Sequence, residues 1–171
     1  MRCIVAVLAL ALAIATSSAT GSTTPTRLRI DGIGPLHLGM TRQAALATGW
    51  LAHRSPGCEL AGPPRPIAYR VNGPNAPKGV LGTAEFTGNR LRALAFTGGV
   101  MTVVGIEVGH STAPQMVTRY RAAGFTAGSH YDATFQETFV TVRRGGRQRI
   151  GGLAEHETID VLAIPAVTVC E

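Results

Sequence analysis

The sequence predicts an exported α+β protein with two tandem units, each a short helix followed by antiparallel strands, closed by one disulfide. Three observations support this fold class. An N-terminal export pattern leaves two cysteines in the mature chain, a short motif occurs twice, and alternating apolar strands follow both copies. We expect the first unit at residues 27–98 and the second at residues 99–171.

The N-terminus has the residue order of a secretory signal. Arg2 precedes the apolar run IVAVLALALAIA, and small residues follow at Ser17 and Ala19. We therefore expect residues 1–19 to be a signal peptide that is cleaved after Ala19. The run is shorter than the roughly twenty apolar residues of a membrane-spanning helix. The mature protein should be secreted or extracytoplasmic without a transmembrane segment, and residues 20–26 should form a flexible polar leader.

Composition indicates a basic protein. The formal net charge is +6 at pH 7, and loss of Arg2 with the signal lowers it to +5. Fourteen of the fifteen remaining cationic side chains are arginines. This balance favours anionic partners in general, although an ordinary basic surface is the alternative. Nucleic acid is not expected, because aromatic residues are few and none is interleaved with the basic ones.

Cys58 and Cys170 are the two cysteines of the mature chain. An even pair in an exported protein is most simply a disulfide. This bond would fasten the C-terminal end to the loop after Trp50. A loop of that size corresponds to on the order of 4 to 5 kcal/mol in the chain-entropy model. We expect removal of the bond to be seriously destabilising.

Local signals place the elements of the first unit. Thr41 as N-cap and Gly49 as a stop predict a short helix over 42–48. The proline-rich stretch 54–66 predicts an irregular loop. Strands are predicted at 67–71, 81–87 and 90–96, the last two joined by a tight turn at Gly88 and Asn89.

The predicted hairpin has a definite register. It pairs Phe86 with Leu91 on an apolar face and Glu85 with Arg92 on the opposite face. An opposite-charge pair of this kind contributes a few tenths of a kcal/mol, roughly.

The second unit should start with a strand at 100–109 and a helix at 112–123. The helix has an apolar stripe at helical spacing, made of Ala113, Met116, Val117 and Tyr120. GSHYD, residues 128–132, is interpreted as a loop. A hairpin around Gly145 and Gly146 and a final strand at 158–164 complete the prediction.

The repeated motif is LHLGMT at 36–41 and IEVGHS at 106–111. Both copies read apolar, polar, apolar, glycine, any residue, hydroxyl, and both lead into a helix that ends in glycine plus an aromatic residue. The offset of 70 residues is close to half the mature chain. This indicates two related helix-plus-sheet units.

The motif resembles the SmpA/OmlA (BamE-like) and β-lactamase-inhibitor-protein repeat. Units of that repeat begin with a glycine, Met or a similar residue, a capping Thr or Ser and a short helix, and then form antiparallel strands. The residues that carry the resemblance are Leu38-Gly39-Met40-Thr41, with Gln43 and Ala44, and Val108-Gly109-His110-Ser111. The chain also looks like small exported proteins of high-GC bacteria with a GxGPLxLGMTxxxA start and a C-terminal cysteine. Its short first helix and proline-rich loop depart from the inhibitor pattern, so no inhibitory residue is carried over.

Gly34, Gly39, Met40 and Thr41 have the spacing of a phosphate-binding P-loop with methionine in place of the lysine. A nucleotide site is not expected, because Met40 supplies no charge and the second copy lacks the first glycine. Gly32, Gly34 and Pro35 occur only in the first copy, and the repeat does not explain them.

We assign no catalytic, cofactor-binding or metal-ligating residues and expect no cofactor. The histidines lack metal-site spacing, and they are His37, His53, His110, His130 and His156. His110 and His130 could converge in three dimensions, or they could be ordinary polar loop residues.

The densest charge cluster is RRGGRQR, with Arg143, Arg144, Arg147 and Arg149. A turn at 145–146 would place Arg144 opposite Arg147 and Arg149 on the same face, which is unfavourable for like charges. The cluster is either solvated or a tip that contacts an anionic envelope polymer, a lipid headgroup or an acidic protein.

The sequence thus favours a non-catalytic binding or envelope-associated module with an unknown protein or anionic cell-envelope component as its partner. A secreted inhibitor of a hydrolase is the alternative by family analogy, and an enzyme of unrecognised class is the third hypothesis. An exposed aromatic patch on a concave sheet would favour a binder or inhibitor, whereas a deep polar pocket would favour an enzyme.

Overall fold

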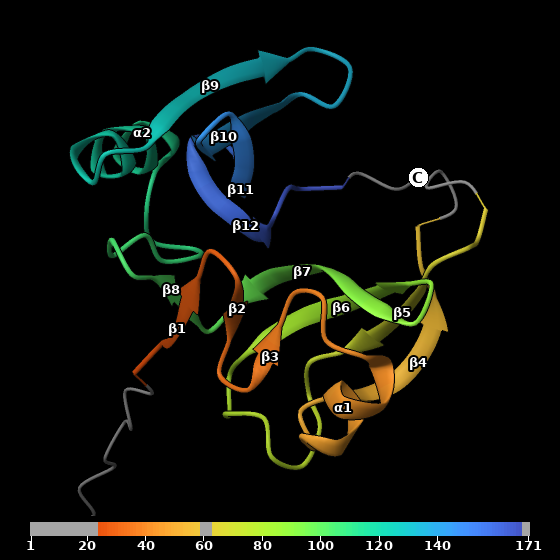
Figure 1. Ribbon diagram of the computed structural model, residues 1–171. Helices are drawn as coiled ribbons and strands as arrows, with labels where there is room; N and C mark the ends of the chain where they lie inside the picture. Colours follow the sequence, from red (N-terminus) through yellow and green to blue (C-terminus); the bar gives the residue numbers. More distant parts are fainter. Residues whose placement is uncertain (1–23, 59–62, 169–171) are drawn as a thin grey trace, which may run out of the picture.

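The protein is mostly β. Its structure, a computed structural model, describes residues 24–58 and 63–168, and it contains 50% strand and 11% helix. The strands form a four-stranded mixed sheet and an eight-stranded antiparallel sheet (Figure 1). The predicted α+β fold of two tandem helix-then-strand units is wrong, because one sheet runs through both parts of the chain and three strands precede the first helix.

The elements follow one another along the chain with short connections. In order they are β1 (Thr26–Arg29), β2 (Gly32–Ile33), β3 (Leu36–His37), α1 (Arg42–Ala47), β4 (Ala52–Pro56), β5 (Ile67–Arg70), β6 (Leu81–Thr87), β7 (Arg90–Gly98), β8 (Val100–Thr102), α2 (Ala113–Ala122), β9 (Thr126–Asp132), β10 (Glu137–Arg144), β11 (Arg147–Glu155) and β12 (Thr158–Ile164). The predicted signal peptide, residues 1–19, lies outside the described residues. Of the predicted flexible leader, Thr26 belongs to β1.

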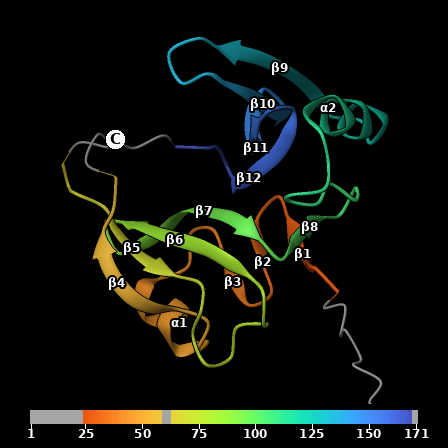
Figure 2. The same ribbon diagram turned by 180° about the vertical axis from the view of Figure 1, so that it is seen from behind.

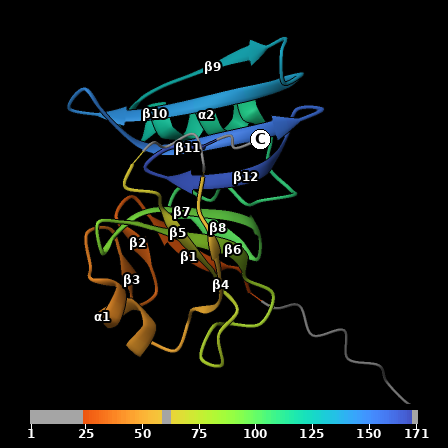
Figure 3. The same ribbon diagram turned by 90° about the vertical axis from the view of Figure 1, so that its right-hand side faces the viewer.

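The eight-stranded sheet has the order β4-β5-β6-β7-β12-β11-β10-β9. Two meanders meet where β7 pairs with β12, with Leu94 opposite Ile164 and Phe96 opposite Leu162. These four side chains have no exposed surface, so the junction is part of the core. Figure 3 shows β9 to β12 above β7 and β6 in one continuous stack. The predicted boundary between residues 98 and 99 falls at the end of β7. Because β7 pairs with β12, one sheet contains strands from both predicted units.

The four-stranded sheet has the order β3-β2-β1-β8. β1 runs parallel to β8, with Thr26 opposite Val100, and it also pairs antiparallel with β2. The predicted strand at 100–109 is shorter than expected. β8 ends at Thr102, whose hydroxyl accepts a hydrogen bond from the Ile106 backbone N–H at 3.1 Å and so stabilises a turn.

Both helices lie within a residue of their predicted bounds. The Thr41 hydroxyl accepts a bond from the Ala44 N–H at the start of α1. Thr112 and Gln115 form a reciprocal capping box at the start of α2, which satisfies two backbone donors that a helix start leaves unpaired. α2 lies against β9, β10 and β11 (Figure 2).

The β6–β7 hairpin has the predicted turn, with Asn89 at φ 63°. Phe86 pairs with Leu91 as predicted, but a bulge shifts the rest of the register, so Glu85 pairs with Ala93 and not with Arg92. The predicted ion pair across this hairpin is therefore wrong. A register prediction that assumes a regular ladder misses an extra residue of this kind.

Two predicted loops contain strands. The irregular loop at 54–66 begins with the end of β4, which pairs with β5 through Pro56 and Ile67. The loop predicted at 128–132 is the second part of β9, which pairs with β10 over seven residues.

Close packing explains the glycines that occur only in the first motif copy. Gly34 has φ +50°, and a Cβ there would collide with the indole ring of Trp50. A Cβ at Gly32 would collide with the carbonyl oxygen of Leu36. Glycine at 34 therefore lets the β2–β3 hairpin approach Trp50 closely, and glycine at 32 lets the two strands of the hairpin pair.

Candidate functional site

The β10–β11 hairpin carries the arginine cluster at an exposed tip. Gly145 and Gly146 have φ of 59° and 74°, the positive values that a type I′ turn needs at both central residues. Arg144 pairs with Arg147 across this turn, as the sequence predicts. Two like charges therefore face each other at the end of the hairpin.

Arg149 differs from its predicted position. Val142 pairs with Ile150 and Arg143 pairs with Gln148, so Arg149 is the extra residue of a bulge. Its side chain is half-buried, and its Nε atom has no hydrogen-bond partner in the described part of the chain. The exposed charge of the tip comes from Arg143, Arg144 and Arg147.

The tip arginines form no ion pair with a carboxylate among the residues that the structure describes. The ion pairs within residues 24–58 and 63–168 are Arg29–Asp31, Glu107–His110 and Glu155–His156. Arg144 instead lies over the ring of Phe125, with 5.2 Å between its Cζ and the ring centroid. This cation–π contact orients one guanidinium and leaves its charge uncompensated.

A shallow groove of about 280 Å³ lies beside the tip on the open face of β9 and β10. Gly128 forms part of its floor, and Thr141, His130 and Arg143 are among its lining residues. A Cβ at Gly128 would meet no atom within 4 Å. The groove therefore combines a cation, an imidazole and a hydroxyl on a flat strand surface.

Aromatic side chains continue from this groove along the open face. The His130 and Phe139 rings stack with centroids 5.4 Å apart, and Phe135 meets Phe139 edge-on at 6.0 Å. Phe135 is 39% exposed. This aromatic cluster is not predicted from the sequence, because His130 is expected there in a loop. The period-2 spacing of Phe139 and Thr141 in β10 is the signal that could have placed both side chains on one face of the sheet.

His110 and His130 do not form a common site. His110 lies 4.0 Å from the carboxylate of Glu107, whereas His130 stacks on Phe139. Within the described ranges, no three His, Cys, Asp or Glu side chains are close enough to hold a metal ion.

A second hollow lies on the open face of β6 and β7, where Ala166 and Thr168 lie beside Glu85. Burial raises the pKa of the Glu85 carboxyl, and a hydrogen bond from the Cys58 backbone lowers it in part. This contact joins the segment after β4 to the middle of β6. The neighbouring groove of about 360 Å³ is lined by Arg70 and Leu81 among others.

Cys58 is 5% exposed. Its predicted partner, Cys170, lies outside the described residues, so the disulfide remains a prediction.

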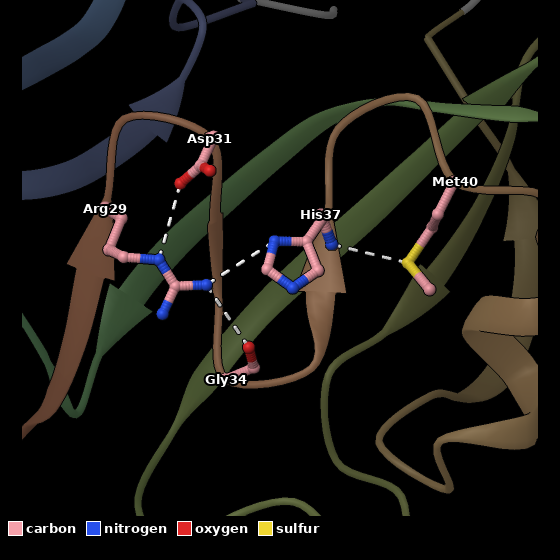
Figure 4. A network of polar contacts seen from close by, with 5 residues as sticks. All are labelled: Arg29, Asp31, Gly34, His37 and Met40. Atoms are coloured by element: carbon pink, nitrogen blue, oxygen red, sulfur yellow. Dashed lines mark hydrogen bonds and ion pairs between the residues drawn. The ribbon is translucent and has the colours of Figure 1, made fainter.

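The segment that has P-loop spacing forms a hairpin and a polar network (Figure 4). The Arg29 guanidinium lies 3.4 Å from each of Asp31 Oδ1, the Gly34 carbonyl oxygen and His37 Nδ1. The His37 N–H donates to the Met40 sulfur at 3.3 Å. Gly34 and His37 thus belong to a hairpin whose polar groups bond to one another.

Within the described residues, no helix has the length and apolarity needed to cross a bilayer. Comparison with models of protein families, with curated proteins and with solved structures finds no match for this chain.

Proposed function

We propose that this protein is an exported, non-catalytic binding protein that contacts an anionic partner through the β10–β11 tip. The observation that carries the proposal is the juxtaposition of Arg144 and Arg147, exposed and without a carboxylate partner in the described part of the chain. The N-terminal export pattern supports an extracytoplasmic location.

Physical chemistry favours an anion at this tip. Paired like charges repel each other, and an anion between them would relieve the repulsion. Guanidinium groups bind carboxylates and phosphates through paired N–H donors, a geometry that lysine does not supply. Phe125 restricts one of the two guanidinium groups and so lowers the entropy lost on binding. The partner is therefore an anionic envelope component or an acidic protein.

The test compares two double variants that change the net charge equally. Arg144→Ser/Arg147→Ser should weaken binding to isolated envelope material at least about tenfold at low salt, a loss of about 1.4 kcal/mol, and should reduce the salt dependence of binding. Arg54→Ser/Arg92→Ser removes two exposed arginines elsewhere on the sheet and should have little effect. Equal losses in both variants, or none, would contradict a specific role for the tip.

The aromatic cluster of Phe135, His130 and Phe139 favours a second candidate function, a secreted inhibitor of a hydrolase. Exposed aromatic side chains are enriched at the centres of protein interfaces. Purified protein should then inhibit a hydrolase in extracellular fractions, and Phe135→Ala should relieve the inhibition. Full inhibition by the Phe135→Ala variant would show that the cluster is not the contact surface.

A further inference from the structure

The two edges of the eight-stranded sheet differ in their protection. At one edge β4 is interrupted by a bulge, has His53 at φ 49° and ends with Arg54, Ser55 and Pro56. Bulges, charges and prolines are the features that keep a strand edge from pairing with another chain. At the other edge β9 has seven residues in unbroken register with β10, and it contains no proline, lysine or arginine. The β9 edge is the one suited to further strand pairing.

The N–H and C=O groups of alternate residues in β9 face away from β10. The Ala127 carbonyl accepts a 2.8 Å bond from the Arg121 Nε–H of α2, which indicates that it faces outward. Because alternate residues of an antiparallel strand face the same way, Ser129 and Tyr131 present their N–H and C=O groups at this edge. These groups can bond to another strand.

Charge is distributed unevenly along the strands next to this edge. One end carries the exposed Arg143, Arg144 and Arg147. The opposite end carries five of the ten acidic residues of the chain: Asp132, Glu137, Glu155, Glu157 and Asp160. A second copy placed antiparallel would bring its acidic end beside the basic end of the first copy, and symmetry would repeat the contact.

We propose that two copies of this chain pair antiparallel through β9, about a two-fold axis at Ser129. This register spans the seven residues of β9 and places Asp132 of one copy opposite Thr126 of the other. In it, the Tyr131 N–H of one copy takes the place of the Arg121 Nε–H at the Ala127 carbonyl of the other. Arg143 is the β10 neighbour of Thr126 on the same face. Arg143 and Thr126 of one copy therefore lie in line with Asp132 of the other copy across the interface. The same arrangement forms twice.

The open-face groove fits this register. His130 of one copy lies opposite Gly128 of the other, whose missing side chain leaves space on the groove floor. The His130–Phe139 stack of each copy then lies beside the other copy's groove, and aromatic surface leaves water on association. The pairing therefore has backbone, charge and apolar components.

The first experiment measures mass by sedimentation over a range of concentrations. The wild-type mature protein should reach twice the mass of a single mature chain. Asp132→Arg and Arg143→Asp should each raise the dimer dissociation constant at least about tenfold, whereas the double variant should restore it to within about threefold of wild type, because the charges exchange places. Asp31→Arg, which changes an exposed carboxylate on the four-stranded sheet, is the matched control. A wild-type monomer at millimolar concentration, or a dimer unaffected by both single reversals, would overturn the proposal.

A second experiment tests the register without relying on charge. Ser129→Cys should form a covalent dimer under mild oxidation, because residue 129 meets its own copy at the axis at a Cα separation of about 5.5 Å, within the disulfide range. Thr126→Cys, on the same strand, should not cross-link, because it meets residue 132. Equal cross-linking of both variants, or cross-linking of Thr126→Cys alone, would exclude the proposed axis.

Discussion

The segments that lead into α1 and α2 share a backbone arrangement but differ in what surrounds it. The Gly39 N–H donates to the Leu91 carbonyl at 2.7 Å, and the Gly109 N–H donates to the Ile159 carbonyl at 2.8 Å. Both glycines have positive φ, +86° and +78°. Each segment thus turns beside a strand of the large sheet and enters a helix capped by threonine.

The helices that follow make unequal contributions to the core. α1 has six residues and buries Ala45, whereas α2 has ten residues and buries Ala113, Met116 and Tyr120. The first segment compensates through its hairpin, where Gly34 packs on Trp50. The shared motif therefore specifies the turn but not the cap, because Thr41 is the last residue of the first copy whereas Thr112 lies one residue beyond the second copy. The Ser111 hydroxyl instead accepts a bond from the Glu107 N–H. The surrounding side chains determine how much each region stabilises the fold.

The largest expected difference concerns the glycines of the first segment. Gly34→Ala should lower the free energy of unfolding by about 2 to 4 kcal/mol, because the new Cβ collides with Trp50 at a positive φ. Gly39→Ala should cost only about 1 kcal/mol, because its φ is positive but no atom lies within 4 Å of the new Cβ. Urea unfolding of both variants measures the difference. Equal losses would show that the Trp50 contact is not tight.

The second prediction concerns Tyr120, the largest side chain that α2 buries. Burial raises its pKa to about 12, and the Thr102 hydroxyl offsets only part of the rise. Because the folded pKa exceeds the unfolded value of about 10, this contribution to stability is complete below pH 10 and is lost as pH rises through 12.

Tyr120→Phe removes this dependence. Between pH 9 and pH 11, wild type should lose about 1 kcal/mol more stability than Tyr120→Phe. At pH 7 the variant should unfold with nearly wild-type stability, because the Tyr120 hydroxyl has no hydrogen bond of good geometry in the described residues. Parallel pH profiles for the two proteins would indicate that the phenol is more hydrated than the structure shows.

The smallest expected difference is between the two caps. Thr112→Ala should cost about 1 kcal/mol, because it breaks a reciprocal capping box on a helix that packs on the sheet. Thr41→Ala breaks a single 3.2 Å bond on a short helix and should cost about 0.5 kcal/mol. Thermal unfolding of the two variants ranks the caps, and the reverse order would mean that α1 contributes more to stability than its burial implies.

Local signals predicted the elements that depend on local chemistry. The turns at 88–89 and 145–146, the Thr41 cap and β12 lie where the sequence places them. β9 was missed because TAGSHYD has small and polar residues in place of the β-branched ones typical of strands, and its pairing with β10 creates the strand.

Long-range pairing accounts for the remaining differences. The parallel contact of β1 with β8 and the junction of β7 with β12 join residues about 70 positions apart, and no local pattern indicates them. The tip was predictable because Arg144 and Arg147 flank a recognisable turn. The aromatic cluster was not predictable, because it forms only when β9 pairs beside β10 and brings His130 next to Phe139.

The junction of β7 with β12 affects where the folded protein opens locally. It consists of three residue pairs, whereas β10 and β11 share seven. Within the eight-stranded sheet, local openings that expose amides to hydrogen exchange are expected first at this junction, because it has the fewest residue pairs of any two neighbouring strands in that sheet. Such an opening would leave β7 and β12 each with an unpaired edge and would expose Leu94, Phe96 and Leu162. Unpaired strand edges with exposed apolar side chains promote aggregation. On mild heating, we therefore expect aggregation to begin with separation of β7 from β12, at temperatures where the β10–β11 hairpin is still paired.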